Sequence, residues 1–172
     1  MLILESLWFL LPLIMANQCP GFAAKLALPG SHTPVSRKWL GKNKTIAAYY
    51  AAPFGALCTL YVQRWIPLWS AKFGLFYYDR PDLWIIGIVL GVAVVIGDHA
   101  KSFIKRRIGK PPGARWWPFD QLDFVVAGII LSIPLVGWIG WQRALTMCLC
   151  VLLVHPIGNR IGYRIGIRKS PW

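Results

Sequence analysis

Long apolar segments, separated by basic connections, are the feature that most constrains this 172-residue chain. A helix needs about 20 apolar residues to cross the hydrocarbon core of a bilayer. The mean hydropathy of +0.51 and the charged fraction of 15% are unusual for a soluble domain. The pattern predicts a single-domain, all-α integral membrane protein with five transmembrane helices. The expected spans are Leu2–Phe22, Ile46–Ile66, Leu83–Gly97, Phe124–Trp138 and Ala144–Gly158.

Some of these segments are too short to span a bilayer alone. The third is expected to continue as a helix into the basic residues that follow it, and the fifth into Asn159–Ile167. The first 24 residues contain neither Lys nor Arg but include Glu5, the reverse of the charged start of a cleavable signal peptide. We therefore expect the first segment to remain as a membrane helix.

The basic residues are distributed unevenly between the connections. Alternate connections, together with the C-terminal tail, carry 15 of the 19 Lys and Arg residues. The positive-inside rule places these connections in the cytoplasm. The N-terminus is then outside and the C-terminus cytoplasmic, as in a protein of the cell (inner) membrane. The net charge of +13 points to lipid headgroups and phosphates as partners, and not to nucleic acid. The sequence does not indicate an oligomeric state.

Charge is concentrated between Gly97 and Asp123, where three of the six carboxylates of the chain occur. Placed on a helix, residues 97–108 carry polar side chains at positions i, i+3, i+4 and i+7, which share one face. Charged groups at a bilayer boundary are costly, which favours a functional role for this face. Its four polar residues are Asp98, Lys101, Ser102 and Lys105.

A second acidic face follows a loop. Gly109–Gly113, with the sequence GKPPG, cannot remain helical. Asp120 and Asp123 lie beyond it, three residues apart at the start of the fourth span. Two consecutive helices are antiparallel, so the two polar faces are expected to meet on the cytoplasmic side.

Carboxylates and lysines together are typical of a site for a metal–polyphosphate complex. Carboxylate oxygens bind Mg²⁺, and lysines neutralise the remaining phosphate charge. We assign the metal to Asp120 and Asp123, with Asp98 as a third ligand or as a residue that orients a lysine. A plain helical ion pair between Asp98 and Lys101, with Asp120 as a helix cap, is the structural alternative.

Further polar residues are expected on the same side. Lys44 and Thr45 lie in the sequence GKNKT before the second span. They fit either basic residues that hold this connection on the cytoplasmic side, followed by a Thr helix cap, or phosphate binding at a helix N-terminus. Asn17, inside the first span, fits either an interhelical hydrogen bond or a substrate contact.

These motifs resemble the CDP-archaeol synthase family, integral membrane cytidylyltransferases distantly similar to CDP-diacylglycerol synthases. The resemblance covers most of the chain. The segment 23–36 and the GKNKT run differ from the Gly-rich loops of the family. The strings that carry the resemblance are ANQCP, TPVS, LGKNKT, GDHAKSFIKRR, PFDQLD and the closing HPIGNRIGYRIGIRKSPW.

The resemblance implies a five-helix fold with cytoplasmic active-site loops at about 23–45 and 98–123. It also implies Mg²⁺-dependent transfer of CMP from CTP to a lipid phosphate, with release of pyrophosphate. In archaeal members the lipid is 2,3-di-O-geranylgeranylglyceryl phosphate. The residues carried over are Asp98, Lys101, Lys105, Asp120 and Asp123 for catalysis and metal binding, and Asn17, Lys44, Thr45 and Ser102 for nucleotide binding.

The main alternative is a non-enzymatic lipid-binding or transport protein of the membrane, for which the basic ends would be anchors. A CDP-alcohol phosphotransferase is not favoured, because its DGxxAR…GxxxDxxxD spacing is absent.

Overall fold

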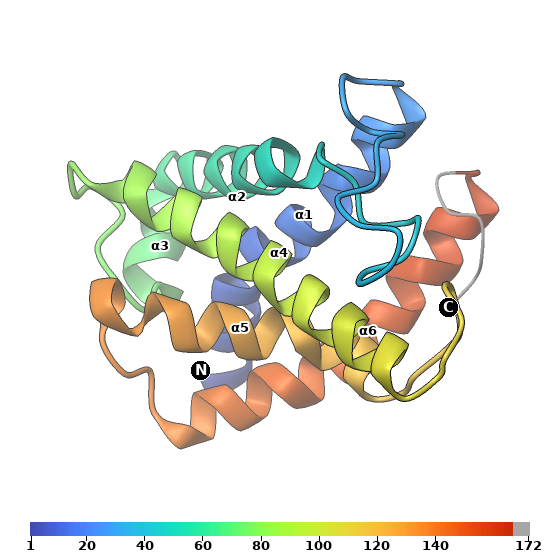
Figure 1. Ribbon diagram of the computed structural model, residues 1–172. Helices are drawn as coiled ribbons and strands as arrows, with labels where there is room; N and C mark the ends of the chain where they lie inside the picture. Colours follow the sequence, from blue (N-terminus) through green and yellow to red (C-terminus); the bar gives the residue numbers. More distant parts are fainter. Residues whose placement is uncertain (167–172) are drawn as a thin grey trace.

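The computed structural model describes residues 1–166 as a bundle of α-helices, and this part of the chain contains no β-strand. Figure 1 shows the bundle. The helices are α1 (Leu2–Lys25), α2 (Ala48–Arg64), α3 (Pro67–Phe73), α4 (Leu83–Arg107), α5 (Phe119–Val136) and α6 (Trp141–Arg164).

Four helices of the described part, α1, α4, α5 and α6, are long and apolar enough to cross a membrane. The predicted second span forms α2, which has only 17 residues. The short helix α3, which follows it, was not expected from the sequence. The count of five spans and the orientation of the termini therefore stay predictions.

The expected helix extensions are confirmed for the third segment and, as far as Arg164, for the fifth. α4 continues past Gly97 through the basic run to Arg107, and α6 continues to Arg164. The predicted end of the last segment, at Ile167, lies outside the described residues. The GKPPG sequence forms a loop, as predicted, and α5 begins at Phe119.

The centre of the bundle is packed with aliphatic and aromatic side chains from α1, α2, α4, α5 and α6. Leu10, Leu13, Ile86, Leu90 and Phe124 are fully buried there. Close packing of this kind stabilises helix contacts in a membrane, where no hydrophobic effect separates helix surfaces from lipid tails. The packed bundle therefore positions the polar groups at one of its ends.

That end collects three segments that are distant in the sequence. Figure 1 shows the loop 26–47, the loop 108–118 and the C-terminal turns of α6 on the same side of the bundle. These are the connections that the positive-inside rule assigns to the cytoplasm. At the opposite end, Arg80 donates to both carboxylate oxygens of Asp82 at 2.5 and 2.6 Å. This contact holds the pKa of Asp82 below its usual range.

Candidate active site

The polar site depends on close contact between α4 and α5. Gly97 packs directly against the backbone of α5, and a Cβ atom at this position would overlap the carbonyl oxygen of Asp123. Asp98, the next residue on α4, is thereby brought beside the first turns of α5. The absence of a side chain at Gly97 thus determines how near the two acidic faces lie.

Lys101 is the centre of the charged cluster. Its Nζ atom lies 2.7 Å from Asp123 Oδ2, 3.1 Å from Asp98 Oδ1 and 3.5 Å from Asp120 Oδ1. The side chains of Lys101 and Asp123 are only 13% and 6% exposed. A single buried ammonium group therefore joins the carboxylates of both helices, as the spacing of the sequence predicted.

Lys105 lies one turn further along α4 and is also buried. Its ammonium group donates to Asp120 at 3.0 Å and to the backbone carbonyl oxygen of Ala114. Asp120 additionally accepts a hydrogen bond of 2.5 Å from the backbone N–H of Trp116. Asp120 thus stabilises the turn before α5, in addition to contacting both lysines.

Lys44 reaches the same cluster from the loop after α1. Its Nζ atom lies 2.5 and 2.6 Å from the two carboxylate oxygens of Asp98. The loop is held in place by an isolated β-bridge between Pro34 and Thr45, with Val35 N–H donating to the Lys44 carbonyl oxygen at 2.8 Å. Lys44 is therefore a fixed part of the site.

The sequence left two interpretations open for the GKNKT run, a Thr cap or an anion site at the start of the second helix, and the geometry of that helix start favours neither. α2 begins at Ala48, several residues after the GKNKT sequence, and no side chain caps it. The N–H groups of Ala48, Tyr49 and Tyr50 already donate to Thr45, Ile46 and Ala47 carbonyl oxygens at 3.1–3.3 Å. These amides already have acceptors, so Lys44 would reach a phosphate through its side chain.

A cavity of about 940 Å³ opens beside the cluster. Its walls come from α1, the loop 26–47, α2, α4, the loop 108–118, α5 and α6. Eight Lys or Arg residues line it against two Asp residues, which makes it a strongly cationic site suited to an anion. The predicted site residues on its wall are Asn17, Lys44, Thr45, Asp98, Lys101, Ser102, Lys105 and Asp120.

Asp123 is the one predicted site residue that does not line this cavity. It lies behind Lys101 and contacts it at 2.7 Å. A metal ion could therefore reach the Asp123 carboxylate from the cavity only if Lys101 moved aside.

Sequence reasoning missed part of the cavity wall. His155 and Asn159, from α6, and Gln121, from α5, line the cavity and are buried. Asn17 Nδ2 lies 3.2 Å from His155 Nε2, which is the interhelical hydrogen bond that the sequence left open for Asn17. The signals that could have found them were the PFDQLD string, which contains Gln121, and the closing HPIGNRIGYRIGIRKSPW string, which contains His155 and Asn159 at positions i and i+4.

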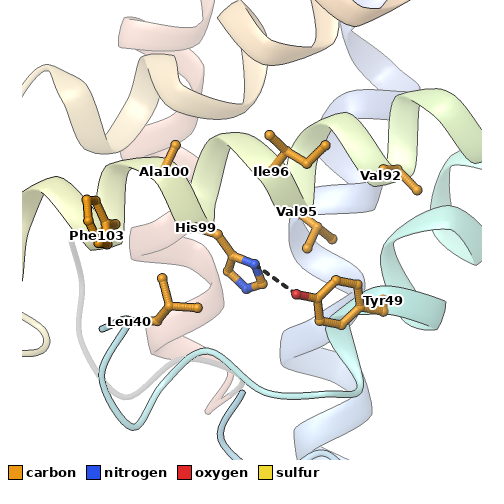
Figure 2. Close-up of a pocket in the computed structure, with 8 residues that line it drawn as sticks. All are labelled: Leu40, Tyr49, Val92, Val95, Ile96, His99, Ala100 and Phe103. Carbon is orange, nitrogen blue, oxygen red and sulfur yellow. Dashed lines mark hydrogen bonds between the residues drawn. The ribbon is translucent and has the colours of Figure 1, made fainter. Parts of the chain in front are cut away.

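An apolar groove of about 370 Å³ adjoins the polar cavity. Figure 2 shows that α4 supplies most of its wall, facing Leu40 and Tyr49. Tyr49 OH and His99 Nδ1 lie 3.3 Å apart within it. Leu40, Val95 and His99 line both spaces, so a long apolar group in the groove would meet the polar cavity at His99.

The donor set suits Mg²⁺ only with a phosphate ligand present. No group of three or more His, Cys, Asp or Glu residues within the described chain is arranged to hold a metal ion alone. Mg²⁺ usually binds one or two carboxylates and takes its other ligands from phosphates and water. Asp98 and Asp123 both contact one ammonium group, so they lie close enough to serve as such a pair.

Comparisons with known proteins identify the family of this chain. The family model described as "CarS-like: CDP-archaeol synthase" matches residues 1–172. This chain belongs to the CDP-archaeol synthase family. It is accordingly a CTP-dependent cytidylyltransferase of archaeal lipid biosynthesis.

Individual members of the family match nearly the whole chain. CDP-archaeol synthase of Methanocaldococcus jannaschii is 32% identical over 184 residues, covering 99% of this chain and 98% of its own. The enzyme of Methanoregula boonei is 31% identical over 160 residues, covering 85% of this chain and 93% of its own. A solved intramembrane enzyme for archaeal membrane lipid biosynthesis has a TM-score of 0.71 and 27% identity, covering 91% of this chain and 94% of its own.

Proposed function

We propose that this enzyme transfers CMP from CTP to an isoprenoid ether lipid phosphate of the geranylgeranylglyceryl class, forming a CDP-lipid and pyrophosphate. The observation that carries the proposal is that the cationic cavity and the apolar groove adjoin each other and share wall residues. The cationic cavity suits a nucleoside triphosphate, and the apolar groove beside it suits a hydrocarbon chain. The names of the relatives support the same product.

The reaction needs one anion to approach another. A lipid phosphate oxygen attacks the α-phosphorus of CTP, forming a new P–O bond. The bond from that phosphorus to the oxygen bridging the α- and β-phosphates breaks, and pyrophosphate leaves with its electron pair. The nucleophile is already anionic, so the protein need not supply a strong base. Its contribution is to position the two phosphates and neutralise their charge.

The basic side chains of the cavity supply this neutralisation. Lys44, Lys101 and Lys105 are held by carboxylates before substrate binds. The positions of Lys44 and Lys105 are therefore preorganised, and these two side chains need little reorganisation when phosphate oxygens replace or join the carboxylates. Lys101 would turn from Asp123 toward the phosphates when a metal binds. Ser102, which is buried on the same wall, is in place to donate to a phosphate oxygen.

Mg²⁺ would add charge neutralisation at the triphosphate oxygens, with Asp98 and Asp123 as its protein ligands. Asp120 is better suited to holding Lys105 and the turn before α5, because it already contacts Lys105 and Trp116 N–H. This assignment differs from the sequence-based hypothesis, which gave the metal first to Asp120 and Asp123.

The lipid chains would lie in the apolar groove of α4. This position puts the lipid phosphate near His99, at the junction of the groove with the cationic cavity. We propose that this end of the bundle, with the loops 26–47 and 108–118, faces the cytoplasm, where CTP is available. The excess of basic residues on these connections supports this orientation.

The test uses the purified protein in lipid vesicles with Mg²⁺ and CTP labelled at the α-phosphorus. The offered lipids are an isoprenoid ether phosphate, a diacyl ester phosphate and the ether alcohol without phosphate. We expect label in the ether lipid, equimolar pyrophosphate, and no product from the alcohol. A protein that only binds or transports lipid would release no pyrophosphate. Equal use of the diacyl lipid would refute the proposed lipid class.

A further inference from the structure

Two buried amide side chains on the cavity wall have unused hydrogen-bonding capacity. Gln121 and Asn159 are 4% and 2% exposed, and both line the cavity. Gln121 Oε1 and Asn159 Oδ1 accept no hydrogen bond from the part of the chain that the structure describes. Buried polar atoms in folded proteins nearly always have a hydrogen-bond partner. Two buried amide oxygens without a partner on a cavity wall therefore point to a polar ligand.

Helix geometry brings these two amides to the same region. The rings of Phe124, on α5, and His155, on α6, lie 5.6 Å apart. Gln121 is one turn before Phe124, and Asn159 is one turn after His155. Because α5 and α6 are antiparallel neighbours, both steps lead toward the same end of the bundle and stay on the facing surfaces.

The Asn159 amide is oriented by His155. Its Nδ2 atom lies 3.3 Å from His155 Nδ1, while Asn17 Nδ2 lies 3.2 Å from His155 Nε2. A neutral imidazole has one lone pair and one N–H, so one of the two asparagines must present its oxygen to the ring. In either orientation the second polar atom of the Asn159 amide is left facing away from His155.

We propose that Gln121 and Asn159 bind the hydrogen-bonding edge of the cytosine base and give the enzyme its preference for CTP. This inference rests on the proposed function. Amide side chains are suited to reading a base edge because they hold a donor and an acceptor side by side. Cytosine presents an N4 amino donor next to the N3 acceptor. Uracil presents the reverse pattern, with an O4 acceptor next to an N3–H donor.

The charges of the cavity support this division of roles. The lysines that suit phosphates are Lys44, Lys101 and Lys105, on the loop 26–47 and on α4. The neutral amides are on α5 and α6. A nucleotide with its triphosphate at the lysines and its base at the amides would match each part of the wall with its own chemistry. A site built on hydrogen bonds discriminates strongly, because the wrong base leaves buried groups unpaired.

The test compares CTP with UTP in Gln121→Met and Asn159→Leu, which keep side-chain volume and remove the amide. We expect kcat/KM for CTP to fall at least tenfold in each variant, and the CTP/UTP ratio of kcat/KM to fall at least tenfold. Inhibition by inorganic tripolyphosphate should stay within twofold of wild type, because it uses the lysines. Ser132→Ala is the matched control, since Ser132 is buried on α5 and its hydroxyl donates to the Ile129 carbonyl oxygen of its own helix at 3.0 Å.

A nucleotide analogue provides the same test without altering the protein. The triphosphate of pyrimidin-2-one riboside lacks the 4-amino group of cytosine. We expect wild-type enzyme to use it at least tenfold less well than CTP. An unchanged CTP/UTP ratio in both variants, or equal use of CTP, UTP and the analogue by wild type, would overturn the inference. Absence of CMP transfer to any lipid phosphate would instead refute the proposed function.

Discussion

Replacing Lys101 with methionine removes the one positive charge shared by three carboxylates. The Lys101 ammonium group lies within 3.5 Å of Asp98, Asp120 and Asp123. Asp98 keeps Lys44, and Asp120 keeps Lys105, but no other ion pair within the described chain reaches Asp123. Lys101→Met therefore leaves one nearly buried carboxylate without a cation.

The expected loss of stability follows from this single unpaired carboxylate. Breaking a buried ion pair by removing one partner costs about 3–5 kcal/mol. We expect the lower value, about 3 kcal/mol, because two of the three carboxylates retain a lysine. For a chain of this size that loss corresponds to a fall of roughly 6–12 °C in the unfolding temperature. Loss of this cation near the phosphates should also lower kcat by about 100-fold or more.

The assay is thermal unfolding in detergent micelles together with CMP transfer from labelled CTP. Lys110→Met, in the loop and outside the cavity wall, is the matched control and should change neither. Adding Asp123→Asn to Lys101→Met should restore at least about 1 kcal/mol of stability but no activity, because the unpaired charge is removed. Wild-type stability and turnover in Lys101→Met would refute the reasoning.

Three other changes test separate parts of the account. Gly97→Ala should destabilise the protein by about 2 kcal/mol and lower turnover, because its Cβ overlaps the α5 backbone, whereas Gly158→Ala, with open space around it, should be neutral or stabilising in thermal unfolding. Lys105→Ala should lower kcat/KM for CTP at least tenfold, whereas replacing the exposed Arg107 with Ala should not. Equal effects would mean that the basic residues serve only to orient the chain in the membrane. Ala100→Trp should fill the apolar groove and raise KM for a long-chain lipid phosphate without raising KM for CTP, and a rise in both would disprove the placement of the lipid.

The helical periodicity of the sequence was sufficient to predict the polar face of α4. Asp98, Lys101 and Lys105 fall on one face at 3.6 residues per turn, and the structure places all of them on the cavity wall. The loop before α5 could also be predicted, because consecutive prolines exclude a helix. These predictions depend only on local geometry, and for that reason they hold.

Contacts between segments distant in the sequence could not be predicted in the same way. The ion pair of Lys44 with Asp98 joins residues 54 positions apart and depends on how the loop 26–47 folds back over α4. The pairing of Asn17 with His155 spans 138 positions. Single-sequence patterns carry no information on such helix crossings, so Gln121 and Asn159 were not assigned to the site.

The central claim is that carboxylates of α4 and α5 converge to hold Mg²⁺ with the triphosphate. The most direct measurement is the Mg²⁺ dependence of CMP transfer in Asp123→Asn, which keeps the shape of the side chain and removes its charge. The account predicts a folded protein whose kcat is lower by about 100-fold or more and whose Mg²⁺ requirement is shifted to higher concentration. A folded variant with turnover and Mg²⁺ dependence within threefold of wild type would contradict it.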